Sequence, residues 1–463
     1  MASQESQNMS QASIYDSLRV FQTVIVPTLA KGVIKRRPWV EAIAQRLGLD
    51  TNAVQLLQEL RKKYGPSPLL LWLPFRSQVV ILDPKDASQV LFGTPVPFTS
   101  ATKEKKSSLG HFEPNHILIA GPERRAQLRP VHKNVLATKD RTHPLMERFR
   151  TVISEELDSL LPPTSTNPET TLDFPTFSEA WFRIVRRITL GDAARDDNDL
   201  TTTLDAIRLR GNWGFMAPAD DSKIFAVQSQ LAHYIQTAEP GSLAFLLPKD
   251  PSNNLDLVSQ ITHYLFGFDA AAIATFRALA LLGSHPDAQA KARDEAKTAS
   301  NNNNNSSSSN PDRPFARAVF LESLRLWPTT PAILRELDQD AAIGGSGHVF
   351  AKGTGVVVFT PLFHRDTENL EFADRLEPGQ WMGEPGKADV DLAKGLVPFS
   401  AGPAMCPAHN LVPMVCTLVM GGVLGRGEGL ELVKPGLEPG KLPGTLDHAE
   451  VELRVRRRVG GSE

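Results

Sequence analysis

Hydrophobic residues recur at helical spacing over most of the chain, and short apolar runs interrupt that pattern in two regions. Residues three or four positions apart lie on one face of an α-helix, so this spacing predicts amphipathic helices. The segments predicted as helices are 50–64, 86–92, 120–137, 145–161, 177–190, 257–282, 286–297, 314–326 and 411–424. Helices therefore dominate the predicted secondary structure.

Short runs of β-branched and other apolar residues, bounded by turn-forming residues, predict strands. The segments predicted as strands are 69–73, 79–82, 341–343, 349–350, 356–360, 430–433 and 451–455. A small β region thus precedes many helices, and β structure returns before and after residue 406. This order predicts a mainly α protein with small β-sheets, an α+β fold.

The longest helical segment, residues 257–282, is apolar and is closed by Ser284-His285-Pro286. Proline shortly after a periodic segment is a typical helix end. At ~1.5 Å per residue this helix runs to nearly ~40 Å. It is therefore long enough to cross a whole domain.

The composition is that of an ordinary globular protein, with 463 residues, of which 41% are hydrophobic and 22% charged. No linker divides the chain cleanly, so we expect one large domain over residues 38–463. The Asn/Ser tract at 300–310 cannot bury apolar surface and predicts a flexible insertion in that domain. The net charge of −2 gives no general case for a nucleic-acid partner.

The N-terminal segment 1–37 is predicted to be disordered or amphipathic. Residues 1–13 are polar and rich in Ser and Gln, a composition typical of disorder. Residues 14–33 lack a run of ~18 apolar residues, so we expect neither a secretory signal nor a membrane-spanning helix. Residues 20–33 with Lys35-Arg36-Arg37 suit a helix packed on the domain or one lying on a membrane surface. We expect a cytoplasmic protein, or one with at most peripheral membrane contact.

A lone thiol stands on a loop of small residues, Phe399-Ser400-Ala401-Gly402-Pro403-Ala404-Met405-Cys406, directly before an apolar helix. A thiolate on such a loop can be the single protein ligand to haem iron, because a tight backbone can approach and tune the sulfur. A free cysteine is more often a small buried hydrophobe. Both interpretations stay open for Cys406 on the loop alone, and for Cys416 we favour core packing. Two cysteines exclude a disulfide scaffold.

The loop resembles the cysteine loop of the cytochrome P-450 family at Phe399, Gly402 and Cys406. It departs from that family at Ala404, where Arg or His is usual, and at Ala408, where Gly is usual. Weaker family segments follow in the right order over roughly residues 38–456. The resemblance implies one large haem domain, a long central helix over haem b, and Cys406 as the axial thiolate ligand to iron.

Glu322 and Arg325 lie one turn apart on the predicted helix 314–326. Alone, such a pair is a common solvated ion pair worth a few tenths of a kcal/mol. The resemblance gives it a structural role, with a third partner in Pro378-Gly379-Gln380-Trp381. The family has Arg where this chain has Gln380, which carries no charge. The resemblance therefore implies that Glu322 and Arg325 are held more weakly than in the family, or that Arg375 replaces the missing third partner.

The resemblance also implies site residues on the long helix and on the basic helix 120–137. Gly267 would let a flat ligand approach, Asp269 would be an acid near bound dioxygen, and Ala270 replaces the family's usual Thr. A plain core helix is the alternative interpretation. Arg129 and Arg335 match positions that bind haem propionates, for which guanidinium forks are suited. Arg125 replaces the family's Trp or His as a third donor, and Arg124 is expected on a solvated face.

The function implied is that of an oxidoreductase, a haem-thiolate monooxygenase that oxidises a mid-sized hydrophobic metabolite with dioxygen, plausible in secondary metabolism. Electrons would come from a separate donor protein. An alternative within the class is an isomerase or dehydratase that needs no dioxygen. A non-catalytic haem-binding protein of the same fold is the second class. The histidines show no zinc-type spacing, and no dinucleotide or phosphate fingerprint is present.

Overall fold

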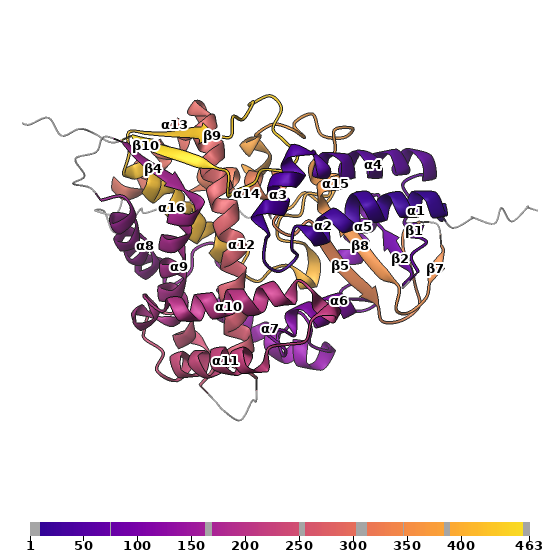
Figure 1. Ribbon diagram of the computed structural model, residues 1–463, viewed down its shortest axis with the longest axis horizontal. Helices are drawn as coiled ribbons and strands as arrows, with labels where there is room; N and C mark the ends of the chain where they lie inside the picture. The colour runs from indigo at the N-terminus through magenta and orange to yellow at the C-terminus, as the bar shows by residue number, and fades with distance from the viewer. Residues whose placement is uncertain are drawn as a thin grey trace, which may run out of the picture.

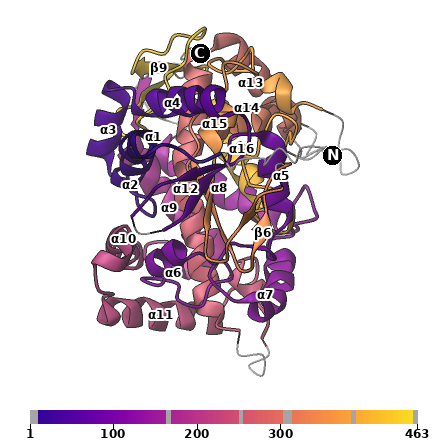
Figure 2. The same ribbon diagram turned by 90° about the vertical axis from the view of Figure 1, so that its right-hand side faces the viewer.

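The computed structural model describes residues 10–74, 76–162, 169–249, 255–301, 313–345, 347–383 and 389–456, with only the backbone described at 299–301. Helix α12 (Leu257–Ser284) runs through the middle of the molecule (Figure 1). In both views α10 (Asn198–Gly211) and α11 (Asp221–Gln236) lie at one end, opposite α13 (Pro286–Asn301) (Figures 1 and 2). The fold is mainly helical with small sheets in one large domain, as the sequence predicts.

The other helices cover α12 and the sheets. They are α1 (Ile14–Val20), α2 (Val26–Ala30), α3 (Pro38–Arg46), α4 (Leu49–Tyr64), α5 (Pro84–Phe92), α6 (Lys103–Leu109), α7 (Pro122–Val135), α8 (Met146–Leu160), α9 (Phe174–Leu190), α14 (Pro314–Leu326), α15 (Thr360–His364) and α16 (Leu411–Gly425). A π-helical turn, Phe21–Ile25, joins α1 to α2. The segments predicted as helices are confirmed, with ends that differ by a few residues.

The strands form a five-stranded sheet in the order β1-β2-β8-β5-β3, a three-stranded sheet β4-β10-β9 and a pair β6-β7. They are β1 (Leu69–Leu71), β2 (Gln78–Val80), β3 (Phe98–Thr99), β4 (Glu169–Asp173), β5 (Ala332–Leu337), β6 (Ala341–Ala342), β7 (Val349–Phe350), β8 (Gly355–Phe359), β9 (Gly429–Lys434) and β10 (Glu452–Arg456). Only β2 and β8 pair in parallel among the described strands. Strands β3, β4 and β5 were not predicted. β4 is largely polar and β5 carries charged residues.

Helix α12 is apolar because it is surrounded by protein on most sides. Its length and mean hydropathy would allow it to cross a membrane. However, 72% of its most apolar 18-residue stretch is buried inside the protein. The Trp181 indole of α9 donates a hydrogen bond to the Phe268 carbonyl at 3.0 Å. A helix that is hydrophobic on all sides is typical of a protein core. Helix α12 is therefore a core helix.

The N-terminal segment differs in part from its prediction. Residues 10–13, expected to be disordered, lie along β1, where the Ala12 N–H donates to the Leu70 carbonyl and the Leu70 N–H to the Ser10 carbonyl. Arg19 of α1 forms a two-pronged ion pair with Glu59 of α4. The segment is thus packed on the domain. Residues 1–9 and the tract 302–310 lie outside the described residues.

Candidate haem site

The Cys406 loop is shaped by a glycine that no other residue can replace without strain. Gly402 has φ +69°, in the left-handed region, and a Cβ there would lie 2.5 Å from the Leu91 carbonyl oxygen of α5. The Cys406 N–H donates to the Phe399 carbonyl at 3.1 Å and closes the loop. Gly402 and Phe399 therefore shape the loop that carries the thiol.

The Cys406 sulfur lies in an environment that combines burial with two sources of positive potential. The residue is half-buried. Burial raises the pKa of the Cys406 thiol, whereas the Ala408 N–H and the charge of Arg129 lower it. Alanine at 408 thus retains the backbone donor, so that departure from the family pattern leaves the hydrogen bond to sulfur intact.

Of the two arginines predicted to bind haem from α7, Arg129 contacts the Cys406 loop and Arg125 lies one turn before Arg129. Arg129 Nη2 donates to the Met405 carbonyl at 2.8 Å, and its buried Nε has no hydrogen-bond partner among the described residues. Arg125 Nη1 donates to Ser100 Oγ at 2.7 Å. Burial lowers the pKa of both guanidinium groups, and the charge of Arg129 lowers that of Arg125 further. Arg124, in contrast, contacts the exposed Gln127.

Arg335 of β5 and Lys105 of α6 complete this group of cations. Burial and the charge of Arg125 lower the pKa of Arg335 to about 10. Burial, Arg335 and Arg125 lower the pKa of Lys105 to about 7. The sequence analysis missed Lys105, because a lysine in the charged run Lys103-Glu104-Lys105-Lys106 has the pattern of a solvated helix.

We call Lys105, Arg125, Arg129 and Arg335 the cation cluster. Their polar contacts in the described residues are to backbone carbonyls and to the hydroxyls of Ser100 and Thr94, not to carboxylates. Buried cations without counter-ions are costly, so a doubly anionic ligand would relieve their mutual repulsion. The two propionates of a haem beside Cys406 fit this requirement.

The interior of α12 is buried except along one face. His263, Phe266, Gly267 and Ala270 are half-buried or exposed, and their spacing of three and four residues places them in one line. We call this line the α12 strip. No atom lies within 4 Å of where a Cβ of Gly267 would stand. The strip therefore borders open space at Gly267. A flat ligand would need such space to approach the helix.

Asp269 lies off the strip. Its Oδ2 accepts a hydrogen bond from Arg208 Nη1 of α10 at 2.8 Å, and Lys35 Nζ lies 4.0 Å away. Burial raises the pKa of the Asp269 carboxyl, whereas the charges of Arg208 and Lys35 lower it. The structure thus places Asp269 in an ion pair facing α10, and its role as an acid near bound dioxygen stays a prediction.

Glu322 and Arg325 form a completely buried ion pair. Arg325 Nε and Nη2 donate to the two Glu322 oxygens at 2.6 and 2.8 Å. Arg325 also donates to the carbonyls of His364, Phe372, Ala373 and Arg375. The pair therefore ties α14 to the segment before the Cys406 loop.

The third partner of this pair is Trp381, not Gln380. Trp381 Nε1 donates to Glu322 Oε1 at 2.8 Å. Gln380 instead contacts Asp391 and Lys394, and Arg375 contributes its backbone carbonyl rather than its guanidinium. An indole N–H replaces the charged partner because Trp381 is the neighbour whose side chain points inward.

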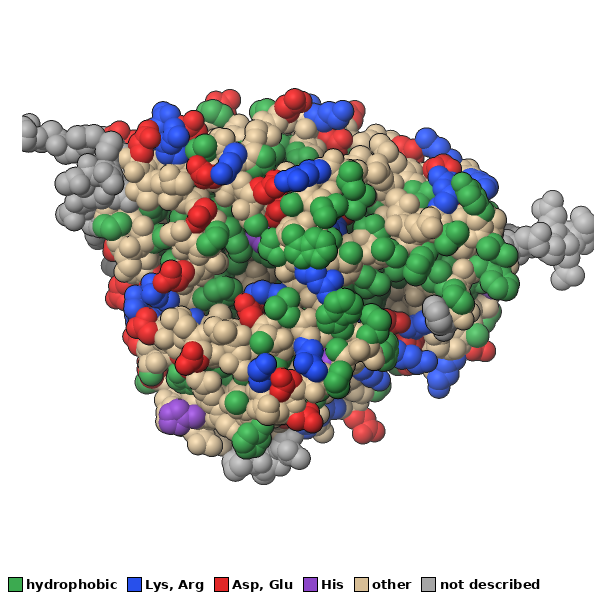
Figure 3. Space-filling model, viewed as in Figure 1, with side chains coloured by type: hydrophobic (Ala, Val, Ile, Leu, Met, Phe, Trp, Pro, Cys, Tyr) green, Lys and Arg blue, Asp and Glu red, His purple; other side chains and the backbone are tan. Residues whose placement is uncertain are grey.

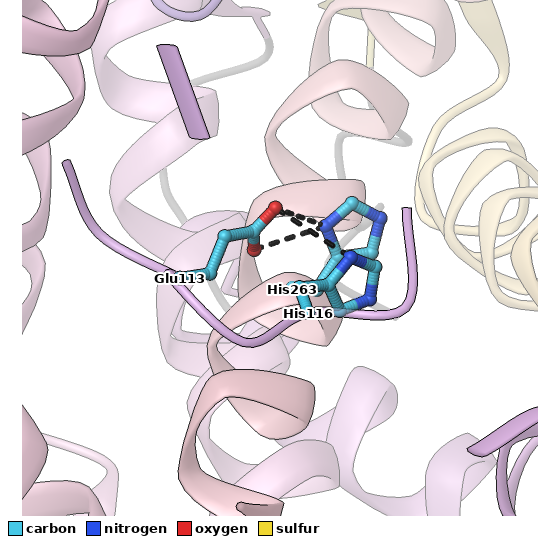
Figure 4. A group of neighbouring side chains, drawn as sticks. All are labelled: Glu113, His116 and His263. Atoms are coloured by element: carbon cyan, nitrogen blue, oxygen red, sulfur yellow. Dashed lines mark hydrogen bonds and ion pairs between the residues drawn. The ribbon is translucent and has the colours of Figure 1, made fainter. Parts of the chain in front are cut away.

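A cluster of polar side chains that was not predicted from the sequence lies at one end of the α12 strip. Glu113 and His116, from the loop after α6, meet His263 of α12 (Figure 4). Glu41, Asp447 and His448 form another buried group, away from Cys406 in sequence and packed around Arg277. Both groups assemble from distant segments, so the short histidine and cysteine spacings typical of zinc sites could not reveal them.

Comparison with known proteins places these features in a family. A sequence model described as cytochrome P-450 matches residues 34–217 and 244–426. Drimenol monooxygenase of Persicaria hydropiper is 30% identical over 179 residues, 37% of this chain and 33% of that protein. Methyltetrahydroprotoberberine 14-monooxygenase of Papaver somniferum is 31% identical over 171 residues, 35% of this chain and 31% of that protein. These matches span about a third of each relative's length.

Solved structures agree on the fold. CYP175A1 of Thermus thermophilus aligns with a TM-score of 0.63 and 18% identity, over 88% of this chain and 96% of that one. A six-coordinated cytochrome P-450 of Thermus thermophilus aligns with a TM-score of 0.61 and 18% identity, over 88% and 98%. Because the family model matches most of its length, the chain belongs to the cytochrome P-450 family, whose members hold haem b through a cysteine thiolate.

Proposed function

We propose that the protein is a haem-thiolate monooxygenase in which Cys406 binds the haem iron and the cation cluster binds the propionates. The observation that carries this proposal is the cation cluster itself. Arg129 contacts the Cys406 loop, and no member of the cluster has a hydrogen bond or ion pair to a carboxylate among the described residues. Two monooxygenases among the relatives support the same reaction class.

The residues of the chain have separable roles in this reaction. A bound haem supplies the reductive splitting of dioxygen, with electrons that we infer come from a separate donor protein. The Ala408 N–H and Arg129 stabilise negative charge on the Cys406 sulfur. Phe266, Gly267 and Ala270 offer an apolar wall with room beside the glycine.

We infer a mid-sized hydrophobic substrate of secondary metabolism. The α12 strip is apolar apart from His263, so it favours a ligand that buries mostly carbon. Two relatives are named as monooxygenases of drimenol and of methyltetrahydroprotoberberine, which supports a substrate of this class. The identity of the substrate is a question for ligand screening.

We further propose peripheral contact with a membrane through an apolar face. Large hydrophobic side chains are exposed on α1 to α3, at β1 and on the α10–α11 connection, and Figure 3 shows hydrophobic side chains gathered over the N-terminal helices. The most exposed are Ile14, Tyr15, Leu29, Trp39, Leu47, Trp72, Trp213, Phe215, Met216 and Phe225. Lys35 is paired with Asp205, and the Arg37 guanidinium lies over the Trp213 ring. Apolar burial, rather than the basic triplet, would therefore drive such contact.

Turnover with a surrogate reductase tests the proposed reaction. NADPH, reductase and dioxygen labelled with ¹⁸O are supplied to the haem-loaded protein, together with compounds that shift its absorption spectrum. One ¹⁸O atom in the product is the expected result. Product formed equally well with dioxygen excluded would favour the isomerase or dehydratase alternative, for which the lack of a side-chain hydroxyl at Ala270 is the motivating feature.

A further inference from the structure

His263 is the single polar side chain of the α12 strip, and its ring is fixed by two neighbours (Figure 4). Its Nδ1 lies 2.8 and 3.0 Å from the two oxygens of Glu113. The Glu113 side chain is fully buried. A carboxylate accepts the hydrogen of Nδ1, which leaves Nε2 as the other nitrogen of the ring. The pair thus sets which nitrogen of His263 can meet a ligand.

His116 holds the His263 ring from one side. The two rings stack, with centroids 3.7 Å apart and an angle of 19° between their planes. The Leu118 N–H donates to His116 Nδ1 at 3.2 Å, and the buried His116 Nε2 has no partner among the described residues. Burial holds the pKa of His116 well below its usual range. A neutral His116 can therefore stack closely without repelling a charge.

Glu113, His116 and His263 have the donor types of a metal site, but their arrangement favours hydrogen bonding. The lone pair of an imidazole nitrogen lies in the plane of the ring. Two nearly parallel rings 3.7 Å apart cannot both aim in-plane lone pairs at one ion between them. The direct hydrogen bond from His263 to Glu113 would also have to break. Metal binding would thus require both rings to turn.

The His263 ring is accessible on the face of α12 that also carries Gly267 and Ala270. Its side chain is 24% exposed, although α12 is largely buried around it. Figure 4 shows the second nitrogen of the ring on the side away from Glu113. Along a helix axis, seven residues correspond to ~10 Å, so His263 lies about that far from Ala270. The strip thus carries a hydrogen-bonding end and an apolar end.

We propose that His263, positioned by Glu113 and His116, is the substrate anchor and accepts a hydrogen bond from a hydroxyl group on an otherwise apolar substrate. This inference rests on the proposed monooxygenase function. It narrows the substrate class to hydrophobic alcohols whose hydroxyl lies roughly ~10 Å from the carbon that reacts.

The surrounding charges favour a neutral hydroxyl over an ionic group. An ammonium group would approach the cation cluster, whose members already lower one another's pKa values. Burial raises the pKa of the Glu113 carboxyl, so a second negative charge from a ligand carboxylate would be disfavoured beside it. A hydroxyl avoids both penalties and gains one hydrogen bond, worth roughly 0.5–1.5 kcal/mol.

Binding of three matched probes to the haem-loaded protein tests this inference. Farnesol, farnesyl methyl ether and farnesene share one carbon skeleton, and only farnesol can donate a hydrogen bond. Their dissociation constants are measured by the shift of the haem absorption band and by calorimetry. Farnesol is expected to bind about tenfold more tightly than the other two, as one good hydrogen bond allows.

Variants then assign the preference to the anchor. His263→Phe retains an aromatic ring and is expected to bind all three probes with the affinity of farnesene. Glu113→Gln would donate to Nδ1 and move the hydrogen to Nε2, so the ether should bind as well as the alcohol. His233→Phe, at an exposed position of α11, is the matched control and should retain the preference.

Each contrary result identifies which proposal fails. Equal binding of all three probes to the wild type, or a preference that survives in His263→Phe, would overturn the anchor while leaving the monooxygenase proposal intact. Stoichiometric Zn²⁺ binding that is lost in His263→Phe would reassign the group to a metal. No binding of any probe, together with no thiolate spectrum, would overturn both proposals.

Discussion

Asp269 of α12 and Arg208 of α10 form a partly buried ion pair, with Asp269 Oδ2 and Arg208 Nη1 2.8 Å apart. Arg208 is only 2% exposed, and its Nε and Nη2 have no hydrogen-bond partner among the described residues. The pair joins the central helix to the helix that crosses it. Asp269 therefore has a structural task in addition to any chemical one.

We predict that Asp269→Asn lowers the free energy of unfolding more than it lowers turnover. Removing the Asp269 charge leaves Arg208 with only the Asp205 carboxylate, 3.9 Å away, as an anionic partner, at a cost of roughly 1–3 kcal/mol. Urea unfolding measures this loss, and Arg208→Met combined with Asp269→Asn should recover much of it. An Asp269→Asn variant of wild-type stability, with turnover reduced ~10²-fold, would instead make Asp269 a proton carrier.

Trp381 should matter more than Gln380 to the pair of Glu322 and Arg325. Trp381→Phe removes a donor to a buried carboxylate and should cost roughly 1–3 kcal/mol. Gln380→Ala should change the unfolding free energy by less than ~0.5 kcal/mol, because its contacts lie at the surface. Chemical unfolding and haem content of the two variants decide between them. A larger effect from Gln380→Ala would restore the assignment suggested by the sequence.

The affinity for haem should depend on pH through Lys105. In the haem-free protein the pKa of Lys105 is lowered to about 7, and an adjacent propionate would raise it. Above about pH 7, haem binding then takes up a proton, so affinity falls as pH rises toward the ordinary lysine range. Competition with a haem-scavenging protein at pH 7, 8 and 9 measures this slope.

Lys105→Met supplies the comparison, because other proton-linked groups, the Cys406 thiol included, are unchanged in it. The difference in affinity between wild type and Lys105→Met should shrink as pH rises from about 7 to 9. A difference that stays constant over that range would place Lys105 outside the propionate site.

Gly402→Ala should distort the Cys406 loop. A Cβ at this position would lie 2.5 Å from the Leu91 carbonyl oxygen, and the φ of +69° strains any other residue. We expect lower haem occupancy by absorbance at equal protein concentration. Gly425→Ala, where no atom lies within 4 Å of the added carbon, is the matched control. Full occupancy in Gly402→Ala would mean that the loop yields more easily than its contacts indicate.

The sequence alone could predict those features that depend on residues close together in the chain. Helix α12 follows from apolar spacing. The structural role of Glu322 and Arg325 came from the family resemblance, because their spacing alone is also that of a solvated ion pair. Gly402 and Phe399 are recognisable because the loop is a contiguous segment. These features depend on local chemistry, which a single sequence displays directly.

The remainder depends on long-range contacts. Lys105 joins the cation cluster only because α6 and β5 meet, and its exposed-looking charged run conceals this. Asp269 pairs with Arg208 from 61 positions away. His263 meets Glu113 across 150 positions. Such partners have no fixed spacing in sequence, so the direction in which each side chain points could come only from the fold.

The most direct measurement of the central claim is the spectrum of the reduced protein with carbon monoxide, in wild type, Cys406→Ala and Cys416→Ala. Cys416 is fully buried in α16 and serves as the control thiol. The account predicts the thiolate-type band in wild type and Cys416→Ala and its loss in Cys406→Ala. A normal thiolate band in Cys406→Ala would contradict Cys406 as the ligand to haem iron.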